Sequence, residues 1–431
     1  MAKKGAMAVL EKELNNKLAY NPLMATLKEN DKKNLFVTNV TTAFLKTGFP
    51  LFDYFFGSVV NIHNEIGQIV QQLPRLGQAC GVINHLIGMS SSGKTSLAIQ
   101  LAANLIRPYK NGQILHFDCE QRMDISRIEN LSQLPIQDFR DGGRYILRSG
   151  MVGMDIIQGM IMDLYASKTK IKDEITVTTD SLDEFGKPIQ ILEPTVIIID
   201  SVKSLLGETF SVDNAKELAD AAKLASNTEG ARVAKGIGGF LKDILAPCKE
   251  ANIIVYLVNH VNSNMSMNAY LPPAKQQLNL KIDESIPGGR AVIFYPFNII
   301  KLIPRGSDDF TPESDGFRGH MVTFEPIKSS SNQSGNSNKG VSFDMVFTSK
   351  RGFDSTRSLI LYGKDKGLLE GTKARLKFIG DPSFTFSFKE LDMEMIEKPI
   401  WECIKKYIIP SLEEHLSYVE PMPYDVRLMD Y

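Results

Sequence analysis

One glycine- and serine-rich segment constrains the possible fold more than any other feature of the sequence. The stretch GVINHLIGMSSSGKTSLAIQLAANL, residues 81–105, contains Gly88, four further residues and then Gly93-Lys94-Thr95. An apolar run typical of a buried strand precedes this turn, and an alanine-rich run typical of a helix follows it. Small residues at such a turn let backbone N–H groups surround phosphate oxygens at the positive end of the helix dipole. The segment therefore predicts a phosphate-binding loop.

Consecutive side chains of this loop have separate expected roles. Lys94 would reach the β- and γ-phosphates of a nucleotide, and Thr95 would ligate Mg²⁺. The other residues expected to contact the phosphates are Gly88, Ser90, Ser91, Ser92, Gly93 and Ser96.

The middle of the chain alternates apolar, strand-like runs with helical stretches. Strands are expected at 81–87, 113–118, 195–200, 252–258 and 292–303. Helices are expected between them, at 95–107, 154–165 and 232–250, and a short helix near the end, at 399–409. Near-continuous Val and Ile runs predict an α/β fold whose mostly parallel, twisted sheet is covered by helices on both faces. The polar segment 168–190 is expected to leave this core, and the low-complexity segment 329–340 to form a loop.

Two acidic residues follow apolar runs of this pattern. Asp200 ends the run TVIIID, and at the carboxyl edge of a parallel strand it would face the same crevice as the phosphate loop and hold Mg²⁺. Without that loop, the same pattern fits an ordinary strand end. Glu120 follows the run at 113–118 and would orient and partly deprotonate an attacking water. The alternative for Glu120 is a surface acid favoured by a helix dipole.

Composition and charge exclude several classes of protein. Lys and Arg number 49 against 50 Asp and Glu, so the chain is not a globally basic nucleic-acid coat, although local binding depends on where the charges lie. The four cysteines form no CxxC pair, which argues against a disulfide framework or a zinc ribbon and favours a reducing cytoplasm. The apolar runs are shorter than a membrane span of ~20 residues. We therefore expect a cytoplasmic protein that has no membrane partner.

Several stretches, in order, resemble the RecA family of strand-exchange recombinases, and in particular its phage UvsX-like branch. The matching segments, which lie within roughly residues 40–365, are KTGFPLFDYFFG (46–57), the phosphate loop, FDCEQRMD (117–124), the acidic strand with Ser201, YLVNH (256–260) and PGGRAVIFY (287–295). The resemblance implies a RecA-like ATPase core at 41–362, an N-terminal helical polymerisation arm at 1–40 and a small C-terminal region at 363–431 with an acidic end.

The resemblance also implies an activity and partners. A member of this family is a DNA-dependent ATPase that uses ATP and Mg²⁺ and forms a helical filament on single-stranded DNA. The filament then pairs with homologous duplex DNA in recombination and repair. Mediator and single-strand-binding proteins are implied as partners, in the cytoplasm of a bacterial or phage-infected cell and associated with its nucleoid.

Roles for individual residues follow from the matching positions. Glu120 would be the catalytic carboxylate, and His260 would sense the γ-phosphate. Asp124 would contact adenine, and Arg127 would stack on it. Lys328 would reach the γ-phosphate bound to a neighbouring subunit, whereas the second basic position of the family is a serine here, Ser329 or Ser330.

The resemblance implies two DNA-binding segments, near 223–235 and from about 261 to 288; without the resemblance, the sequence of both fits flexible loops. Glycines there permit close approach of the backbone to DNA, basic side chains meet phosphates, and methionine or tyrosine side chains stack on bases. The candidate DNA-binding residues are Arg232, Lys235, Lys242, Met265, Met267, Tyr270, Gly288, Gly289 and Arg290.

The charges near the C-terminus are unevenly distributed. Residues 345–379 hold eight basic residues and three acidic ones, whereas residues 391–431 hold nine acidic and four basic. The basic stretch fits duplex-DNA binding or a solvated face, and the acidic end fits competition with DNA or simple solubility. Three other functions also fit the sequence: a hexameric replicative helicase, a nucleotide-switched ATPase without a DNA role, and a DNA-binding filament protein whose ATP turnover is incidental.

Overall fold

The protein is described from a computed structural model. The described residues are 42–64, 69–140, 142–150, 152–205, 228–263, 280–281, 283–331, 341–416 and 418. The expected N-terminal arm at 1–40 lies outside them, as do most of the loop at 329–340 and the end of the acidic tail. The described residues from Ala43 onward belong to one compact unit.

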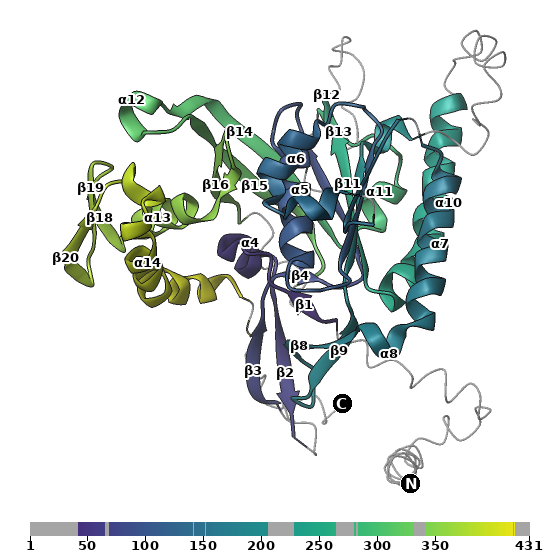
Figure 1. The fold of residues 1–431 in the computed structure, drawn as a ribbon, viewed down its shortest axis with the longest axis horizontal. Coiled ribbons are helices and arrows are strands. Elements are labelled where there is room, and N and C mark those ends of the chain that lie inside the picture. The colour runs from purple at the N-terminus through teal and green to yellow at the C-terminus, as the bar shows by residue number, and fades with distance from the viewer. Residues whose placement is uncertain are drawn as a thin grey trace, which may run out of the picture. The chain divides into compact units, whose positions relative to one another are not determined.

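A mixed sheet is the centre of this unit (Figure 1). Among the described residues its strands lie in the order β17 (Gly352–Asp354), β16 (Phe343–Thr348), β15 (Gly319–Ser329), β14 (Asn298–Phe310), β5 (Ile83–Gly88), β11 (Ile253–His260), β10 (Thr195–Asp200), β6 (Gln113–Asp118) and β7 (Tyr145–Ser149). From β14 to β7 every neighbouring pair is parallel, and from β14 to β17 every pair is antiparallel. The predicted α/β class with a mostly parallel sheet is confirmed.

Successive residues of the central strands point to opposite faces of the sheet. In β10, Val196 and Ile198 belong to one hydrophobic cluster, and Ile197 and Ile199 belong to the other. The first cluster contains α4 (Pro50–Phe55) and α5 (Lys94–Ile106), and the second contains α7 (Met154–Lys170), α10 (Thr228–Glu250) and α11 (Ala291–Phe294). Figure 1 shows α7 and α10 packed together on one side of the sheet. Burial on both faces explains why these strands read as continuous apolar runs.

The expected strand at 292–303 was placed too early. Residues Ala291–Phe294 form helix α11, and β14 begins only at Asn298. Val292 and Ile293 are buried against the second cluster, and the Val292 carbonyl accepts a hydrogen bond from His85 Nδ1 at 2.9 Å. A short apolar run has no periodicity that separates a buried helix turn from a strand.

The polar segment at 168–190 leaves the main sheet, as expected, but it is ordered. Helix α7 extends to Lys170, and α8 (Lys172–Ile175) follows. The hairpin of β8 (Thr176–Leu182) and β9 (Pro188–Leu192) then forms a separate two-stranded sheet. Its Ser181 Oγ accepts a hydrogen bond from the Phe44 amide at 2.9 Å, in β1 (Phe44–Leu45).

The C-terminal region shares the core of the first face. It contains α13 (Ser355–Asp365), β18 (Leu369–Thr372), β19 (Arg375–Phe378), β20 (Asp381–Phe386) and α14 (Glu394–Cys403), followed by a π-helical segment at Ile404–Ile408 and a 3-10 helix at Ile409–His415. Phe378, Phe388 and Ile400 are fully buried in the same cluster as helix α4. The predicted helix at 399–409 is part of a longer helical stretch that begins at Glu394.

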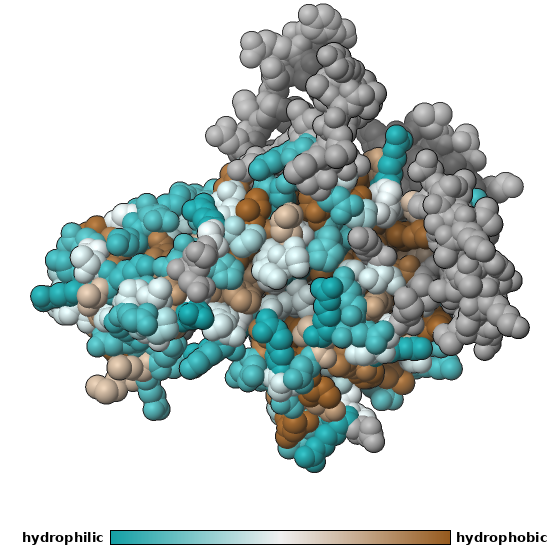
Figure 2. Space-filling view, turned by 90° about the horizontal axis from the view of Figure 1, so that it is seen from above, coloured by the Kyte–Doolittle hydropathy of each residue, from teal (hydrophilic) through white to brown (hydrophobic). Residues whose placement is uncertain are grey.

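Many charges of the basic stretch 345–379 pair with acidic side chains. The pairs are Arg351–Asp392, Arg357–Asp354, Arg357–Asp392, Lys366–Glu414, Lys373–Asp315 and Lys377–Glu370. Three of these six join the basic stretch to the acidic end, at Asp392 and Glu414. Figure 2 shows a mainly hydrophilic surface over this part of the protein. Ion pairs therefore connect the basic stretch to Asp392 and Glu414 within one chain.

None of the helices formed by the described residues is both long and apolar enough to cross a membrane.

The segment TGFPLFD (residues 47–53) is hydrogen-bonded to helix α5. Asp53 is buried, and its Oδ1 accepts hydrogen bonds from the Thr47 amide at 2.9 Å and the Thr47 hydroxyl at 2.6 Å. The Thr47 carbonyl accepts a hydrogen bond from Asn104 Nδ2 in α5 at 2.7 Å. A Cβ on Gly48 would lie 2.9 Å from the same amide nitrogen, so this approach requires a glycine.

Because Asp53 is buried, its carboxylate makes stability depend on pH. Burial raises the pKa of Asp53 to about 7, although the Thr47 hydrogen bonds oppose this shift. The unfolded chain releases this proton near pH 4 and the folded chain only near pH 7, so the stabilising contribution is full below about pH 4 and is lost as the pH rises to about 7.

We expect Asp53→Asn to remove this decrease in stability with rising pH. Relative to wild type, the variant should gain about 1.4 kcal/mol of unfolding free energy per pH unit across this window. Chemical denaturation of both proteins at about pH 5 and about pH 7 measures the difference. If the difference in unfolding free energy between the variant and the wild type is the same at both pH values, the assignment is contradicted.

Candidate functional site

The register of the central strands gathers the predicted residues at one edge of the sheet. Asp200 pairs with Asp118 on one side and with Val258 on the other. His260 pairs with Gly88, the first residue of the phosphate loop. The carboxyl ends of β5, β6, β10 and β11 therefore meet at one edge, which is where ligands of open α/β sheets bind.

The phosphate loop turns the chain from β5 into α5. Gly93 is the N-cap of α5 at φ +88°, in the left-handed region that glycine tolerates. A Cβ on Gly88, at φ +152°, would lie 2.5 Å from the Leu302 carbonyl oxygen, so the loop begins at a position that only glycine fits. The N-terminus of a helix of 13 residues then faces the same edge as the acidic residues.

Lys94 lies inside the loop. Its Nζ donates hydrogen bonds to the carbonyls of Gly88 at 3.1 Å and Met89 at 2.6 Å. Burial lowers the pKa of Lys94 to about 8, against the opposing influence of Asp200 and Glu120. Lys94 is largely shielded from water, so its charge is poorly solvated. A bound phosphate group would supply a negatively charged partner for its ammonium.

Thr95 and Asp200 are in direct contact, as expected of two residues that share a metal ion. The Thr95 hydroxyl donates a hydrogen bond to Asp200 Oδ2 at 2.5 Å. Burial raises the pKa of Asp200 to about 6, and the hydrogen bond from Thr95 opposes the shift. Within the part of the chain that the structure describes, no three His, Cys, Asp or Glu side chains cluster as a metal site. One hydroxyl and one carboxylate fit Mg²⁺, which takes few protein ligands and completes its shell with phosphate and water.

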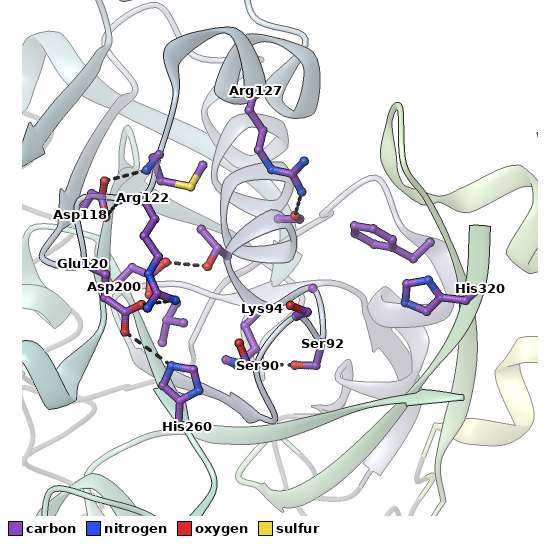
Figure 3. A pocket seen from close by; sticks show the side chains of 17 residues that line it. Ser90, Ser92, Lys94, Asp118, Glu120, Arg122, Arg127, Asp200, His260 and His320 are labelled. Atoms are coloured by element: carbon purple, nitrogen blue, oxygen red, sulfur yellow. Dashed lines mark hydrogen bonds and ion pairs between the residues drawn. The ribbon is translucent and has the colours of Figure 1, made fainter. Parts of the chain in front are cut away.

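Glu120 is the centre of a polar cluster beside the loop (Figure 3). Its Oε1 accepts a hydrogen bond from Ser201 Oγ at 2.8 Å and lies 3.5 Å from His260 Nε2. Its Oε2 lies 3.2 Å from an Nη of Arg122. The two residues predicted to act on the γ-phosphate, Glu120 and His260, are therefore neighbours.

Asp118 shapes the loop that presents Glu120. Its two carboxylate oxygens accept hydrogen bonds from the backbone amides of Arg122 at 3.3 Å and Met123 at 2.9 Å. Gln121 adopts φ +54°, a left-handed conformation that is uncommon for a residue with a side chain. Asp118 was not among the predicted site residues, although it ends the strand that precedes Glu120.

The site is a cavity of about 480 Å³. Its lining includes the predicted residues Ser90, Ser91, Ser92, Gly93, Lys94, Thr95, Ser96, Glu120, Arg127, Asp200 and His260. Residues that sequence reasoning missed also line it: Asp118, Arg122, Met123, Val258, His320 and Phe347.

The rings of His320 and Phe347, tilted by 40° to one another, line the cavity away from Glu120. Their ring centroids are 5.3 Å apart, and they come from the paired antiparallel strands β15 and β16. In Figure 3, Arg127 and His320 lie away from Glu120 and Asp200. No local sequence signal identifies these two rings, because only the order of strands in the sheet brings them to the loop.

Two predicted site residues make other contacts. Asp124 is the N-cap of α6 (Ile125–Ser132) and accepts hydrogen bonds from the amide and hydroxyl of Ser126, and it is not among the lining residues. The Lys328 ammonium donates to the carbonyls of Ile293 at 3.3 Å and Phe294 at 2.6 Å in its own chain, and it is not a lining residue either.

The candidate DNA-binding residues are described only in part. Met265, Met267 and Tyr270 lie outside the described residues, and Arg232 lies in α10. Lys235 and Lys242 are exposed on α10, and Arg290 is exposed beside Gly289. A Cβ on Gly289 would lie 2.8 Å from the Cβ of Ala234, so the beginning of α10 and the Gly-Gly segment are adjacent. Two segments separated in sequence thus lie together.

No protein-family model matches this sequence, and no curated protein matches it either.

We expect Asp118→Asn to loosen the loop that carries Glu120. One carboxylate oxygen becomes an amino group, so the amide of Arg122 or Met123 loses its acceptor. A hydrogen bond to a charged group contributes about 1.5–3 kcal/mol, so exchange of these amides should accelerate about tenfold or more. Hydrogen exchange measured by mass spectrometry over 119–124 tests this. Asp124→Asn is the control, because Asp124 bonds Ser126 instead; equal exchange in both variants would contradict the role of Asp118.

Proposed function

We propose that the protein is an ATP-dependent DNA recombinase that forms a filament on single-stranded DNA and pairs it with homologous duplex DNA. The observation that carries the proposal is the meeting, at one sheet edge, of the phosphate loop, the Thr95–Asp200 contact and the Glu120–His260 pair. This set of groups supports hydrolysis of a nucleoside triphosphate.

Each group has a role in that reaction. The loop amides and Lys94 bind the β- and γ-phosphates. Thr95 and Asp200 would hold Mg²⁺, which would supply positive charge to the phosphate oxygens. Glu120 accepts a proton from the attacking water as the water oxygen bonds to the γ-phosphorus. The bond from that phosphorus to the β–γ bridging oxygen breaks, and ADP leaves with the electron pair. His260 lies beside Glu120 and is suited to contact the γ-phosphate.

The nucleobase would bind at the opposite end of the cavity. The ring of Phe347 and the imidazole of His320 provide flat surfaces there, and the Arg127 guanidinium lies on the helix side of the cavity. Stacking of a purine on an aromatic ring or a guanidinium is favourable and tolerant of orientation. We assign the base to these residues rather than to Asp124, whose oxygens cap α6.

Coupling to DNA would run through the strand that ends at His260. Asn259 Oδ1 accepts a hydrogen bond from the His260 amide, and Asn259 Nδ2 donates one to the Pro287 carbonyl, both at 2.9 Å. Pro287 precedes the Gly288-Gly289 segment, which lies against α10 and its exposed Lys235. A change at the γ-phosphate therefore has a short path to both candidate DNA segments. In a filament, Lys328 would contact the γ-phosphate of a neighbouring subunit.

The decisive experiment compares ATP hydrolysis, filament formation and strand exchange in wild type, Lys94→Ala and Glu120→Gln. We expect wild-type ATPase to increase with single-stranded DNA, and homologous strands to be exchanged. Lys94→Ala should lose nucleotide binding and assembly, because no other loop cation lies at this position. Glu120→Gln should bind ATP and assemble, but its turnover should fall about a hundredfold or more because it lacks the general base.

Other outcomes would favour other functions. Unwinding of duplex DNA by closed rings, without pairing, would favour a replicative helicase. ATP turnover without any response to DNA would favour a regulatory ATPase. Assembly and pairing that persist in Lys94→Ala would mean that ATP turnover is incidental to DNA binding. Normal hydrolysis by Glu120→Gln would contradict the assignment of the base alone.

A further inference from the structure

Arg122 is a pocket residue whose position suggests more than a structural role. It lies two residues after Glu120 in the loop between β6 and α6, and it lines the cavity. Its guanidinium lies 3.2 Å from Glu120 Oε2, although 71% of its side chain is exposed to solvent. The Arg122 backbone is held by Asp118, whereas its side chain is largely free of packing.

The cations of the cavity are distributed unevenly. The lining residues include three Lys or Arg side chains, Lys94, Arg122 and Arg127. Lys94 is held inside the phosphate loop by carbonyl oxygens, and Arg127 Nη2 lies 3.3 Å from Ser96 Oγ on helix α5. Of these three, Arg122 is the one in an ion pair with Glu120, at the end of the cavity where the γ-phosphate would be attacked (Figure 3).

The guanidinium of Arg122 can readily leave Glu120 for another anion. An ion pair with one solvent-exposed member contributes little to stability, on the order of 0–1 kcal/mol. A phosphate group with its several charged oxygens forms stronger, bidentate bonds with a guanidinium than a single carboxylate oxygen does. A γ-phosphate in the cavity would therefore compete successfully with Glu120 for Arg122.

We propose that Arg122 is a catalytic residue that binds the γ-phosphate from within the same chain. This inference rests on the proposed ATPase function. On binding, the guanidinium turns from Glu120 Oε2 to the γ-phosphate, so that this carboxylate oxygen becomes available to accept the proton of water. The water oxygen then bonds to the γ-phosphorus as the bond to the β–γ bridging oxygen breaks. Arg122 stabilises the negative charge on the transferred group and gains or loses no proton itself.

The test compares Arg122→Ala, Arg122→Lys and Arg122→Gln with wild type. A fluorescent ADP and a fluorescent non-hydrolysable ATP analogue report binding, and phosphate release reports turnover. Arg122→Ala should lower kcat about a hundredfold, and weaken binding of the ATP analogue about tenfold. Its affinity for ADP should change less than about twofold, because ADP lacks the group that Arg122 contacts. Arg122→Lys should have a higher kcat than Arg122→Ala, whereas the kcat of Arg122→Gln should be as low as that of Arg122→Ala.

Arg140→Ala is the matched control, since Arg140 is exposed nearby in the chain and is not among the cavity-lining residues. It should behave as wild type. Equal loss of ADP and ATP-analogue affinity in Arg122→Ala, or a lowered melting temperature in all three Arg122 variants, would show a structural role and overturn the inference. Wild-type kcat in Arg122→Ala would overturn it as well. Failure of wild type itself to bind or hydrolyse ATP would instead reject the proposed function, and this inference with it.

Discussion

The in-register, parallel pairing of β5, β11, β10 and β6 is the constraint on which the rest of the structure depends. These four strands are buried on both faces, and each ends at the same edge of the sheet. The strand register alone therefore brings four residues together: Gly88, Asp118, Asp200 and His260. A shift of one residue in any pair would move a site residue along the edge and also turn buried side chains to the wrong face.

Burial and charge are balanced differently in the site and in the rest of the protein. Lys94 and Asp200 are desolvated, and their pKa values move toward neutrality, to about 8 and about 6. Both groups line the same cavity, and pKa values shifted by burial are typical of functional sites. Arg357, by contrast, is buried with Asp354 and Asp392 as partners, and it stabilises the C-terminal region. At least one basic residue of the stretch 345–379 is thus part of the folded interior.

The first face of the sheet links stability to the site. Thr47 and Asp53 fasten the segment before α4 to Asn104 on α5, and α5 carries the phosphate loop at its N-terminus. Phe353 lies against Gly93 from β17, with its ring 3.0 Å from where a Cβ would be. The helix that carries Lys94 and Thr95 is therefore held from two directions, whereas most of the Arg122 side chain is exposed to solvent.

The amino-acid sequence determined the local part of this protein. A glycine-rich turn between an apolar run and a helix, and acidic residues after apolar runs, are short-range patterns, so β6, β10 and the start of α5 could be predicted almost to the residue. The tertiary structure alone decided the walls of the site. His320 and Phe347 arrive on β15 and β16 through antiparallel pairing that no local pattern specifies, and the 291–294 helix turn depended on burial beneath α10. The sequence shows an arginine two positions after Glu120. Only the fold of its loop around Asp118 shows that its guanidinium forms an ion pair with Glu120. Local backbone preferences act over a few residues, whereas contacts around this cavity join residues far apart in the sequence, such as Thr95 with Asp200 and Gly93 with Phe347.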